Sequence, residues 1–338
     1  MTRPRRPLRH NAATQGRATR RAFLQGLAAL PLGTATPGRA QERTRLVLAT
    51  AGPGSAFLAF GRAAQPVIER HAPITVEIRE TGGSNENAEL VSAGTAHLAT
   101  LNLGPAYDAW TGQGVFAGRT LRGMRAVVPM YETPFHTVAL ADSGIAGLRD
   151  LRGKRVGVGP AGGPIEVFFR GLAEFLSIKA TLVTGTPNEL AAKLLARDID
   201  ALWYGSGIPS PPFTTIADQA DAVVFGFKPD EAQAFRRRFP YFTPYEIPAG
   251  TYRGQAQGLS SMAVWNFLVA HEGLSAEVVL ALTRALLDHA DEVRAAYPTA
   301  AAMTRANAVA NGFLPFHPGA ARYYRDKAVP VAPALLDG

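Results

Sequence analysis

The sequence Thr81-Gly82-Gly83-Ser84-Asn85-Glu86-Asn87 follows an alternating run at residues 74–78 and leads into a helix-forming segment at residues 88–91. This order predicts a strand, a glycine turn and a helix start. The two glycines allow a sharp turn and a close approach of the backbone to a ligand, and Ser84 or Asn85 can cap the first helical N–H groups. Such a helix start attracts a carboxylate or another hydrogen-bond acceptor. An ordinary capped turn explains the same residues, so the rest of the chain decides between the two.

The composition is that of a globular protein. The chain has 338 residues, 47% of them hydrophobic and 18% charged, which is enough for a packed core and for two domains. Its formal net charge of +8 comes from residues 1–40, which contain eight arginines and no acidic residue. Without these eight, 27 of the 35 basic residues remain, against 27 acidic ones. The remainder is neutral, so no nucleic-acid partner is expected.

Residues 1–40 have the order of regions typical of an export signal. An arginine-rich start precedes Arg20-Arg21-Ala22-Phe23-Leu24, a short apolar run follows at residues 27–32, and Gly38-Arg39-Ala40 offers small residues at both key cleavage positions. The paired arginines resemble the twin-arginine signal of bacteria, whereas the alternative is a basic tail beside a short helix. We expect a twin-arginine signal peptide, a mature chain from Gln41 and a periplasmic protein. It should not be inserted in the membrane, because no apolar stretch is long enough to span it.

The mature sequence divides into two halves, each beginning with a strand and a glycine-rich loop. The pattern restarts around Asp142-Ser143-Gly144. In both halves strands alternate with helices, which predicts βαβ units, a mostly parallel sheet and a ligand cleft between the halves. The predicted strands are residues 46–50, 74–80, 96–101, 121–130, 135–141, 156–159, 181–184, 199–204 and 262–269. The predicted helices are residues 56–71, 85–94, 105–111, 168–177, 188–196, 275–297 and 299–309.

A series of short motifs follows in order along the mature chain. Besides the 81–87 loop, they are Ala106-Tyr107-Asp108-Ala109, Phe116-Ala117-Gly118, Ala141-Asp142-Ser143-Gly144-Ile145, Leu151-x-Gly153-Lys154-Arg155-Val156, Ile247-Pro248-Ala249-Gly250-Thr251-Tyr252 and His317-Pro318-Gly319-Ala320-x-Arg322-Tyr323-Tyr324. Each motif is weak alone, but their order and spacing are specific. Together they resemble the TAXI class of solute receptors, which serve tripartite ATP-independent periplasmic (TRAP) transporters.

This resemblance implies an α/β fold of the type II periplasmic-binding-protein class, with two α/β lobes around a central ligand cleft. Residues 44–138 and 247–338 would form lobe 1, and residues 139–246 would form lobe 2. The resemblance also implies a small-molecule ligand, a membrane-embedded TRAP permease as partner, and a cleft or hinge role for His136. We therefore expect a monomeric, extracytoplasmic solute-binding receptor.

A catalytic set is not evident in the sequence. Ser55, Ser84 and Ser206 lie in glycine loops, but the sequence pairs none of them with a base. His97, in an apolar strand, is expected to be structural. The chain contains no cysteine and no metal-ligand spacing. We therefore expect no enzyme activity, no metal and no cofactor.

The ligand-binding residues are expected in loops at helix starts and strand ends, although glycine loops and caps also occur without ligands. The candidates are Gly54, Ser55, Ala56, Phe57, Ser84, Asn87, Asn102, Gly162, Gly163, Pro164, Glu166, Tyr204 and Gly205.

The second-lobe loop departs from the family that the chain resembles. Where relatives commonly have a Gly-Thr-Arg-like end, this chain reads Gly163-Pro164-Ile165-Glu166. An arginine there would suit a carboxylate, whereas a glutamate about 4 Å away would repel one by up to ~4 kcal/mol. Ala56 also replaces a hydroxyl residue, and Leu103-Gly104 replaces a polar pair beside Asn102.

These departures lead to a ligand hypothesis. We expect a neutral, amine-bearing or aromatic small molecule, and not the glutamate or related dicarboxylate usual in the family. The expected contacts are stacking on Phe57, Trp203 or Tyr204 and polar contacts from Ser84 and Asn87.

Three alternative functions stay open. The first two are a binding protein for an ABC importer and a ligand sensor for a membrane kinase, which the sequence barely separates from a TRAP receptor. The third is an enzyme on the same two-lobe fold, which would need a base near the cleft or a cofactor-attaching cysteine.

Overall fold

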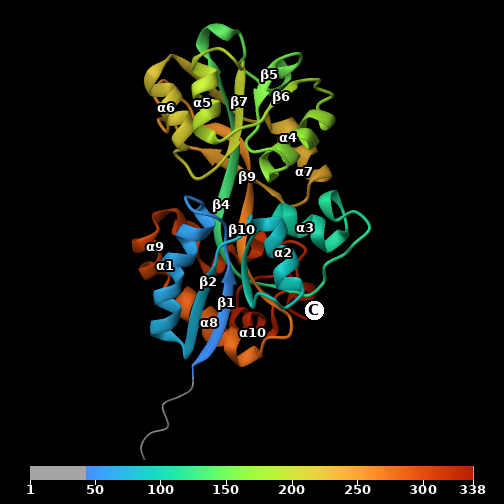
Figure 1. Ribbon diagram of the computed structural model, residues 1–338, viewed down its shortest axis with the longest axis vertical. Coiled ribbons are helices and arrows are strands. Elements are labelled where there is room, and N and C mark those ends of the chain that lie inside the picture. The colour runs from blue at the N-terminus through green and yellow to red at the C-terminus, as the bar shows by residue number, and fades with distance from the viewer. Residues whose placement is uncertain (1–42, 338) are drawn as a thin grey trace, which may run out of the picture. The chain divides into compact units, whose positions relative to one another are not determined.

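The computed structural model describes residues 43–337 and has a mixed α/β fold, as predicted (Figure 1). Its strands join in one 10-stranded sheet with the main order β2-β1-β3-β10-β4-β7-β5-β6, and β8 and β9 pair with β4 and β10. Within the described range, none of the helices combines the length and the apolar character needed to cross a membrane. The predicted signal peptide, residues 1–40, lies outside the described residues.

Three parallel strands form one end of the sheet, and each is followed by a helix. In chain order the elements are β1 (Thr44–Ala49), α1 (Ala56–His71), β2 (Ile74–Arg79), α2 (Ser84–Ser92), β3 (Leu98–Asn102) and α3 (Leu103–Thr111). The predicted alternation of strands and helices is confirmed here. The helix α1 is amphipathic and buries Phe60, Ala64 and Val67 on one face.

Three further parallel strands form the other end in the same way. The elements are β5 (Arg155–Gly157), α4 (Pro164–Phe175), β6 (Thr181–Val183), α5 (Pro187–Leu195), β7 (Ala201–Gly205), α6 (Pro211–Gln219), β8 (Ala222–Phe225) and α7 (Pro229–Arg238). The helix α4 begins at Pro164, four residues before the predicted start at residue 168, and α6, which begins at Pro211, was not among the predicted helices. Proline suits the first helical position, because its missing N–H would have no helical acceptor there.

Two long antiparallel strands connect the ends of the sheet. β4 (Met124–Leu140) pairs with β10 (Leu259–His271) and then with β7 and β8, while β10 pairs with β3 and with β9 (Phe242–Ile247). The two strands predicted at residues 121–130 and 135–141 are therefore one strand, and the sheet is mixed instead of mostly parallel. The predicted lobe boundaries, 138/139 and 246/247, fall within β4 and at the end of β9, and they stay a prediction.

β4 carries extra residues relative to β10. Tyr131 pairs with Asn266, but Pro129 pairs with Phe267, so Met130 is left over on β4. A second register shift follows two residues further along β10. Such bulges bend a strand, increase its twist and tolerate proline. β4 is thus bent near Met130, between the end of the sheet that contains β3 and the end that contains β7.

The C-terminal segment packs against the end of the sheet formed by β1, β2 and β3. It comprises α8 (Ala276–Asp288), α9 (Ala290–Ala296), α10 (Pro318–Asp326) and α11 (Pro333–Leu336), and α8 contacts both α1 and α10. The helix predicted at residues 275–297 is divided at His289. The helix predicted at residues 299–309 consists of two 3₁₀ segments, Pro298–Ala302 and Arg305–Ala310.

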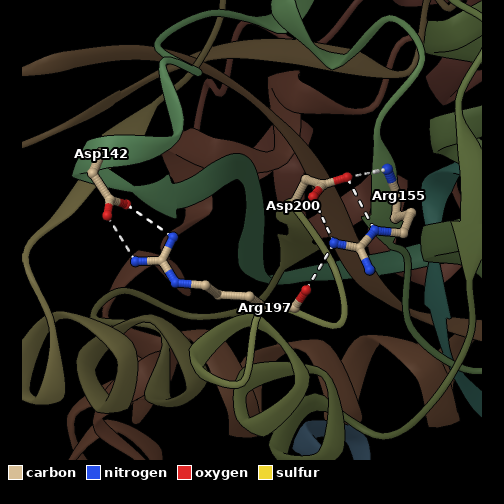
Figure 2. Close-up of polar contacts among 4 residues, drawn as sticks. All are labelled: Asp142, Arg155, Arg197 and Asp200. Atoms are coloured by element: carbon tan, nitrogen blue, oxygen red, sulfur yellow. Dashed lines mark hydrogen bonds and ion pairs between the residues drawn. The ribbon is translucent and has the colours of Figure 1, made fainter.

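Ion pairs connect residues at the ends of the strands around β5 and β7 (Figure 2). Asp200, just before β7, accepts from the backbone N–H of Arg155 at 2.7 Å and from its guanidinium at 2.8 and 3.2 Å. The same guanidinium donates to the carbonyl oxygen of Arg197 at 2.7 Å, and Arg197 pairs with Asp142 beyond β4, also at 2.7 Å. The hydrogen bond from Arg155 lowers the pKa of Asp200.

We predict that Asp200→Asn lowers the free energy of unfolding by about 1 kcal/mol at pH 7, because it weakens a bidentate pair that also holds a backbone N–H. The pKa of Asp200 is lower in the folded than in the unfolded chain, so this stabilisation is present above the unfolded pKa. It is lost as the pH falls through the folded pKa. Urea unfolding at pH 7 and pH 3 measures the difference.

The matched control is Asp142→Asn, which removes the carboxylate of the fully exposed pair and should cost less stability than Asp200→Asn. An equal loss for both variants, or a loss for Asp200→Asn that is unchanged at pH 3, would contradict the prediction.

Candidate ligand-binding site

The carboxyl ends of β1, β2 and β3 lie at one edge of the sheet, because the three strands are parallel. The loops that follow them lead directly into α1, α2 and α3, so three helices begin at this edge (Figure 1). In open α/β sheets this edge is where ligands bind. The predicted site residues from Gly54 to Asn102 all belong to these loops and helix starts.

A buried hydrogen-bond network fixes the 81–87 loop to this edge. The side-chain amide of Asn87 donates to the carbonyl oxygens of Thr50 and Thr100, at 2.6 and 2.8 Å. Its amide oxygen accepts from the hydroxyl of Thr81 at 2.7 Å. Asn87 is completely buried. Its polar groups are therefore used in holding the loop to the ends of β1 and β3, and the predicted ligand contact of Asn87 stays untested.

Side chains cap two of the three helices that begin here. Ser55 Oγ accepts from the N–H of Leu58 at 3.1 Å and caps α1. Asn102 Oδ1 accepts from the N–H of Gly104 at 3.1 Å and caps α3. These contacts occupy the predicted site residues Ser55 and Asn102 with local hydrogen bonds.

The start of α2 is different. Gly83 precedes it with φ 101°, a conformation that favours glycine, and no side chain caps α2 among the residues that the structure describes. The prediction that Ser84 caps this helix is wrong, because Ser84 Oγ accepts from the backbone N–H of Asn102 at 3.2 Å. The first N–H groups of α2 are thus left for another acceptor.

Asn266 is a residue of this region that the sequence analysis missed. It lies on β10, is buried, and its amide oxygen accepts from Nδ2 of Asn102 at 3.1 Å. Its Nδ2 donates to the carbonyl oxygen of Tyr131 at 3.0 Å and to the hydroxyl of Thr133 at 2.9 Å. One side chain therefore links the capped start of α3 to the bent part of β4. The sequence feature that could have indicated this role is an asparagine within the otherwise apolar predicted strand at residues 262–269.

The loop before α4 is held by Glu166. This side chain is buried, its Oε2 accepts from the N–H of Gly162 at 2.7 Å, and its Oε1 accepts from Nε of Arg170 at 2.9 Å. The bond from Gly162 and then the pairing with Arg170 lower the pKa of Glu166. The carboxylate is therefore paired with Gly162 and Arg170, which weakens the physical reason for excluding an acidic ligand.

The other residues of the loop before α4 are exposed to solvent or half-buried. Gly162 and Pro164 are exposed, and Gly163 is half-buried as the residue preceding α4. On the β1 side, Gly54 and Ala56 are exposed and Phe57 is half-buried. These residues are accessible to a ligand, and their predicted contacts stay untested.

The aromatic residues of β7 have different surroundings. Trp203 is completely buried and its ring stacks 5.5 Å from that of Phe135, so the expected ligand-stacking role of Trp203 is wrong for this conformation. Tyr204 is half-buried, and burial raises its pKa. A Cβ at Gly205 would lie 2.4 Å from the ring of Phe135, so glycine is required here for packing.

Contacts join the start of α3 to α4, which belongs to the predicted lobe 2. A Cβ at Gly104 would lie 2.4 Å from the ring of Phe168, so the ring rests directly on the α3 backbone. The rings of Tyr107 and Tyr241 lie 5.4 Å apart beside this contact. The starts of α2 and α3 are thus connected through Ser84 and Asn102, and Gly104 connects the start of α3 to the helix α4.

Two histidines singled out from the sequence have structural contacts. Nδ1 of His97 accepts from the N–H of Val47 at 3.0 Å, which confirms the structural role predicted for it. His136 on β4 is completely buried, and its Nε2 lies 2.7 Å from the hydroxyl of Tyr252. Burial lowers the pKa of His136 to about 3, so this imidazole is neutral near pH 7.

A surface pocket of about 480 Å³ lies elsewhere, along β9 and β10. Its lining residues are Pro244, Tyr245, Glu246, Gly258 and Ser260. None of them is a predicted site residue. We place the candidate site at the strand ends and helix starts, because free backbone donors and connected loops meet there.

We predict that Asn87→Ala lowers the free energy of unfolding by roughly 3 kcal/mol, because it removes the buried hydrogen bonds of Asn87 with Thr50, Thr81 and Thr100. Ser84→Ala should cost about 1 kcal/mol, since it removes one hydrogen bond to the Asn102 N–H. The half-buried Asn85 provides the control, and Asn85→Ala should change stability least. Chemical denaturation measures all three. A loss for Asn87→Ala no larger than that for Asn85→Ala would contradict the structural role of Asn87.

The chain is similar to known proteins both in its sequence family and in its fold. The model of the NMT1-like family matches residues 48–327. The chain is similar to a ligand-free TctC solute-binding protein from Polaromonas, with 15% identity, a TM-score of 0.51, and coverage of 78% of this chain and 89% of that chain. It is also similar to malate-bound MatC from Rhodopseudomonas palustris, with 16% identity, a TM-score of 0.47, and coverage of 76% and 88%.

At 15% identity the first of these similarities shows the fold alone. That fold, two α/β lobes of the periplasmic-binding-protein kind, is the one predicted from the sequence. The family match extends over most of the chain. The chain therefore belongs to the NMT1-like family.

Proposed function

We propose that the protein is a periplasmic solute receptor that captures a small molecule between two lobes and delivers it to a TRAP-type permease. It would bind its ligand without transforming it. The observation that carries the proposal is the start of α2, which lacks a side-chain cap in the described structure, whereas Ser55 and Asn102 cap the neighbouring helices. This start lies at the edge of the sheet where ligands bind in this kind of fold. The resemblance to the TAXI class supports the transporter type.

The proposed ligand carries a carboxylate or a comparable hydrogen-bond acceptor. Free N–H groups and the positive end of the helix dipole at α2 favour such a group. Glu166 does not oppose it, because Gly162 and Arg170 occupy its carboxylate. The sequence led us to expect a neutral or amine-bearing ligand. Binding of such a ligand is now the alternative result of the binding test.

Lobe closure would complete the proposed site. Closing two lobes removes a ligand from water and gives a permease a shape to distinguish from the open form. The contact of Phe168 with the backbone at Gly104 is a candidate closing contact, because it joins the predicted lobes next to the α2 start. A side chain at position 104 would obstruct it.

We predict that acidic solutes such as glutamate, 2-oxoglutarate and malate include one that raises Tm by several degrees in a thermal-shift screen of the mature chain. Ser84→Ala should weaken this binding about 3- to 10-fold in isothermal titration calorimetry, because it removes a hydroxyl beside the α2 start. Stabilisation only by neutral or amine-bearing solutes would contradict the proposed ligand class.

We predict that Gly104→Ala weakens ligand binding by at least about 10-fold, because the added methyl group would clash with Phe168 in the closed form. The matched control is Gly52→Ala, where a Cβ meets no atom within 4 Å. Titration of both variants with the solute found in the screen measures the effect. Equal affinities for the two variants would argue against the Gly104–Phe168 contact as part of closure.

The partner is tested separately from the ligand. Proteoliposomes that contain a TRAP permease of the same organism should take up the labelled solute only when the receptor is added. Uptake through an ABC permease instead, or activation of a membrane kinase by the liganded receptor, would assign the protein to one of the alternative systems.

A further inference from the structure

A cluster of two histidines and a glutamate lies away from the candidate ligand site. His71 is the last residue of α1, His289 lies between α8 and α9, and Glu292 is in the first turn of α9. Figure 1 shows α1 and α9 beside each other, and their residues are in contact. One potential ligand atom from each side chain lies within 4.8 Å of the other two. The cluster therefore joins the end of one helix to the junction of two others.

The donor atoms converge on one carboxylate oxygen. Nε2 of His71 lies 2.7 Å from Oε1 of Glu292, and Nδ1 of His289 lies 3.7 Å from the same oxygen. The two imidazole rings are stacked, with centroids 3.5 Å apart and an interplanar angle of 6°. The ring nitrogens thus lie close together, and one ring must turn out of the stack before both can direct a lone pair at the same ion.

This spacing matches the requirements of a zinc ion. Zinc binds histidine nitrogen and carboxylate oxygen at about 2.0–2.2 Å, so tetrahedral donors are about 3.4 Å apart. The separations of 2.7 and 3.7 Å lie on either side of that value, and a turn of one imidazole out of the stack, with shifts of about 1 Å, would bring the three donors around one ion. Two imidazoles and one carboxylate, with water in the fourth position, form a common zinc donor set.

We propose that His71, His289 and Glu292 bind a zinc ion that fastens the end of α1 to the α8–α9 junction. The group that competes for the site is the guanidinium of Arg70, which pairs with the other carboxylate oxygen of Glu292. Arg70 is largely exposed and can turn away into solvent. Binding would stabilise the part of the chain formed by α1, α8 and α9, because the ligands come from segments that are far apart in the sequence.

The test uses the chain from residue 41 onward without an affinity tag, since a polyhistidine tag would itself bind zinc. Isothermal titration with zinc chloride should give one saturable site. Zinc at about 100-fold above Kd should raise Tm by about 4 °C, and magnesium should not, because it prefers oxygen donors. X-ray absorption at the zinc edge should detect two imidazoles.

The variants separate the proposed site from non-specific binding. His71→Ala, His289→Ala and Glu292→Gln should each weaken zinc binding by at least about 10-fold. All three replace side chains that are at most half-buried, and circular dichroism verifies that they fold. Arg70→Ala should bind zinc at least as tightly as the unchanged chain, because it removes a competing cation. His271→Gln removes a remote histidine and should leave the affinity unchanged.

Saturable binding that the three ligand variants leave intact would overturn the proposal, and so would the absence of a one-to-one site. Neither result bears on the proposed solute receptor, because the cluster shares no residue with the candidate ligand-binding site.

Discussion

The side chain of Asn266 connects the start of α3 to β4, which is one of the two strands that join the ends of the sheet. It accepts from Asn102 at the start of α3 and donates to Tyr131 and Thr133 on β4. These contacts occur where β4 carries an extra residue relative to β10 and bends. Leaving a buried donor or acceptor unpaired costs about 1–3 kcal/mol. The fold is therefore favoured when all three hydrogen bonds of Asn266 are formed together. The position of the α3 start is thereby tied to the shape of the strand that continues into the β5–β7 end of the sheet.

This link gives the candidate site a fixed part and an adaptable part. Asn87 and the backbone ends of β1 and β3 hold the 81–87 loop rigidly at the sheet edge. The opposing α4 touches this edge through Phe168, against the backbone at Gly104. An aromatic ring on a glycine can separate without breaking a hydrogen bond. The arrangement combines donors at α2 with an aromatic contact between the predicted lobes, and in the proposed receptor this contact would open and close around the solute.

The sequence predicted the alternating elements well, because strands and helices are encoded in local apolar patterns. The bounds of α1 at residues 56–71 were predicted without error. The continuity of β4 was not predicted, since a proline-containing polar segment at residues 131–134 interrupts the apolar run and only pairing with β10 shows one strand. At the candidate site, the sequence identified loops at strand ends and helix starts, but it did not indicate the direction of their side chains. Whether Glu166 faces a ligand or its own loop depends on Arg170 one turn later, and Trp203 could be placed only by its packing on Phe135.

In the proposed receptor, ligand binding would bring the two predicted lobes together, with β4 and β10 running between them. The chain contains no cysteine, so Arg62→Cys on α1 and Ala192→Cys on α5 would carry the only two spin labels. Double electron–electron resonance then measures the distance between the labels with and without the bound solute. We expect the distribution of distances between the two labels to become shorter and narrower at saturating ligand. A distribution that does not change while calorimetry shows full occupancy would contradict this expectation.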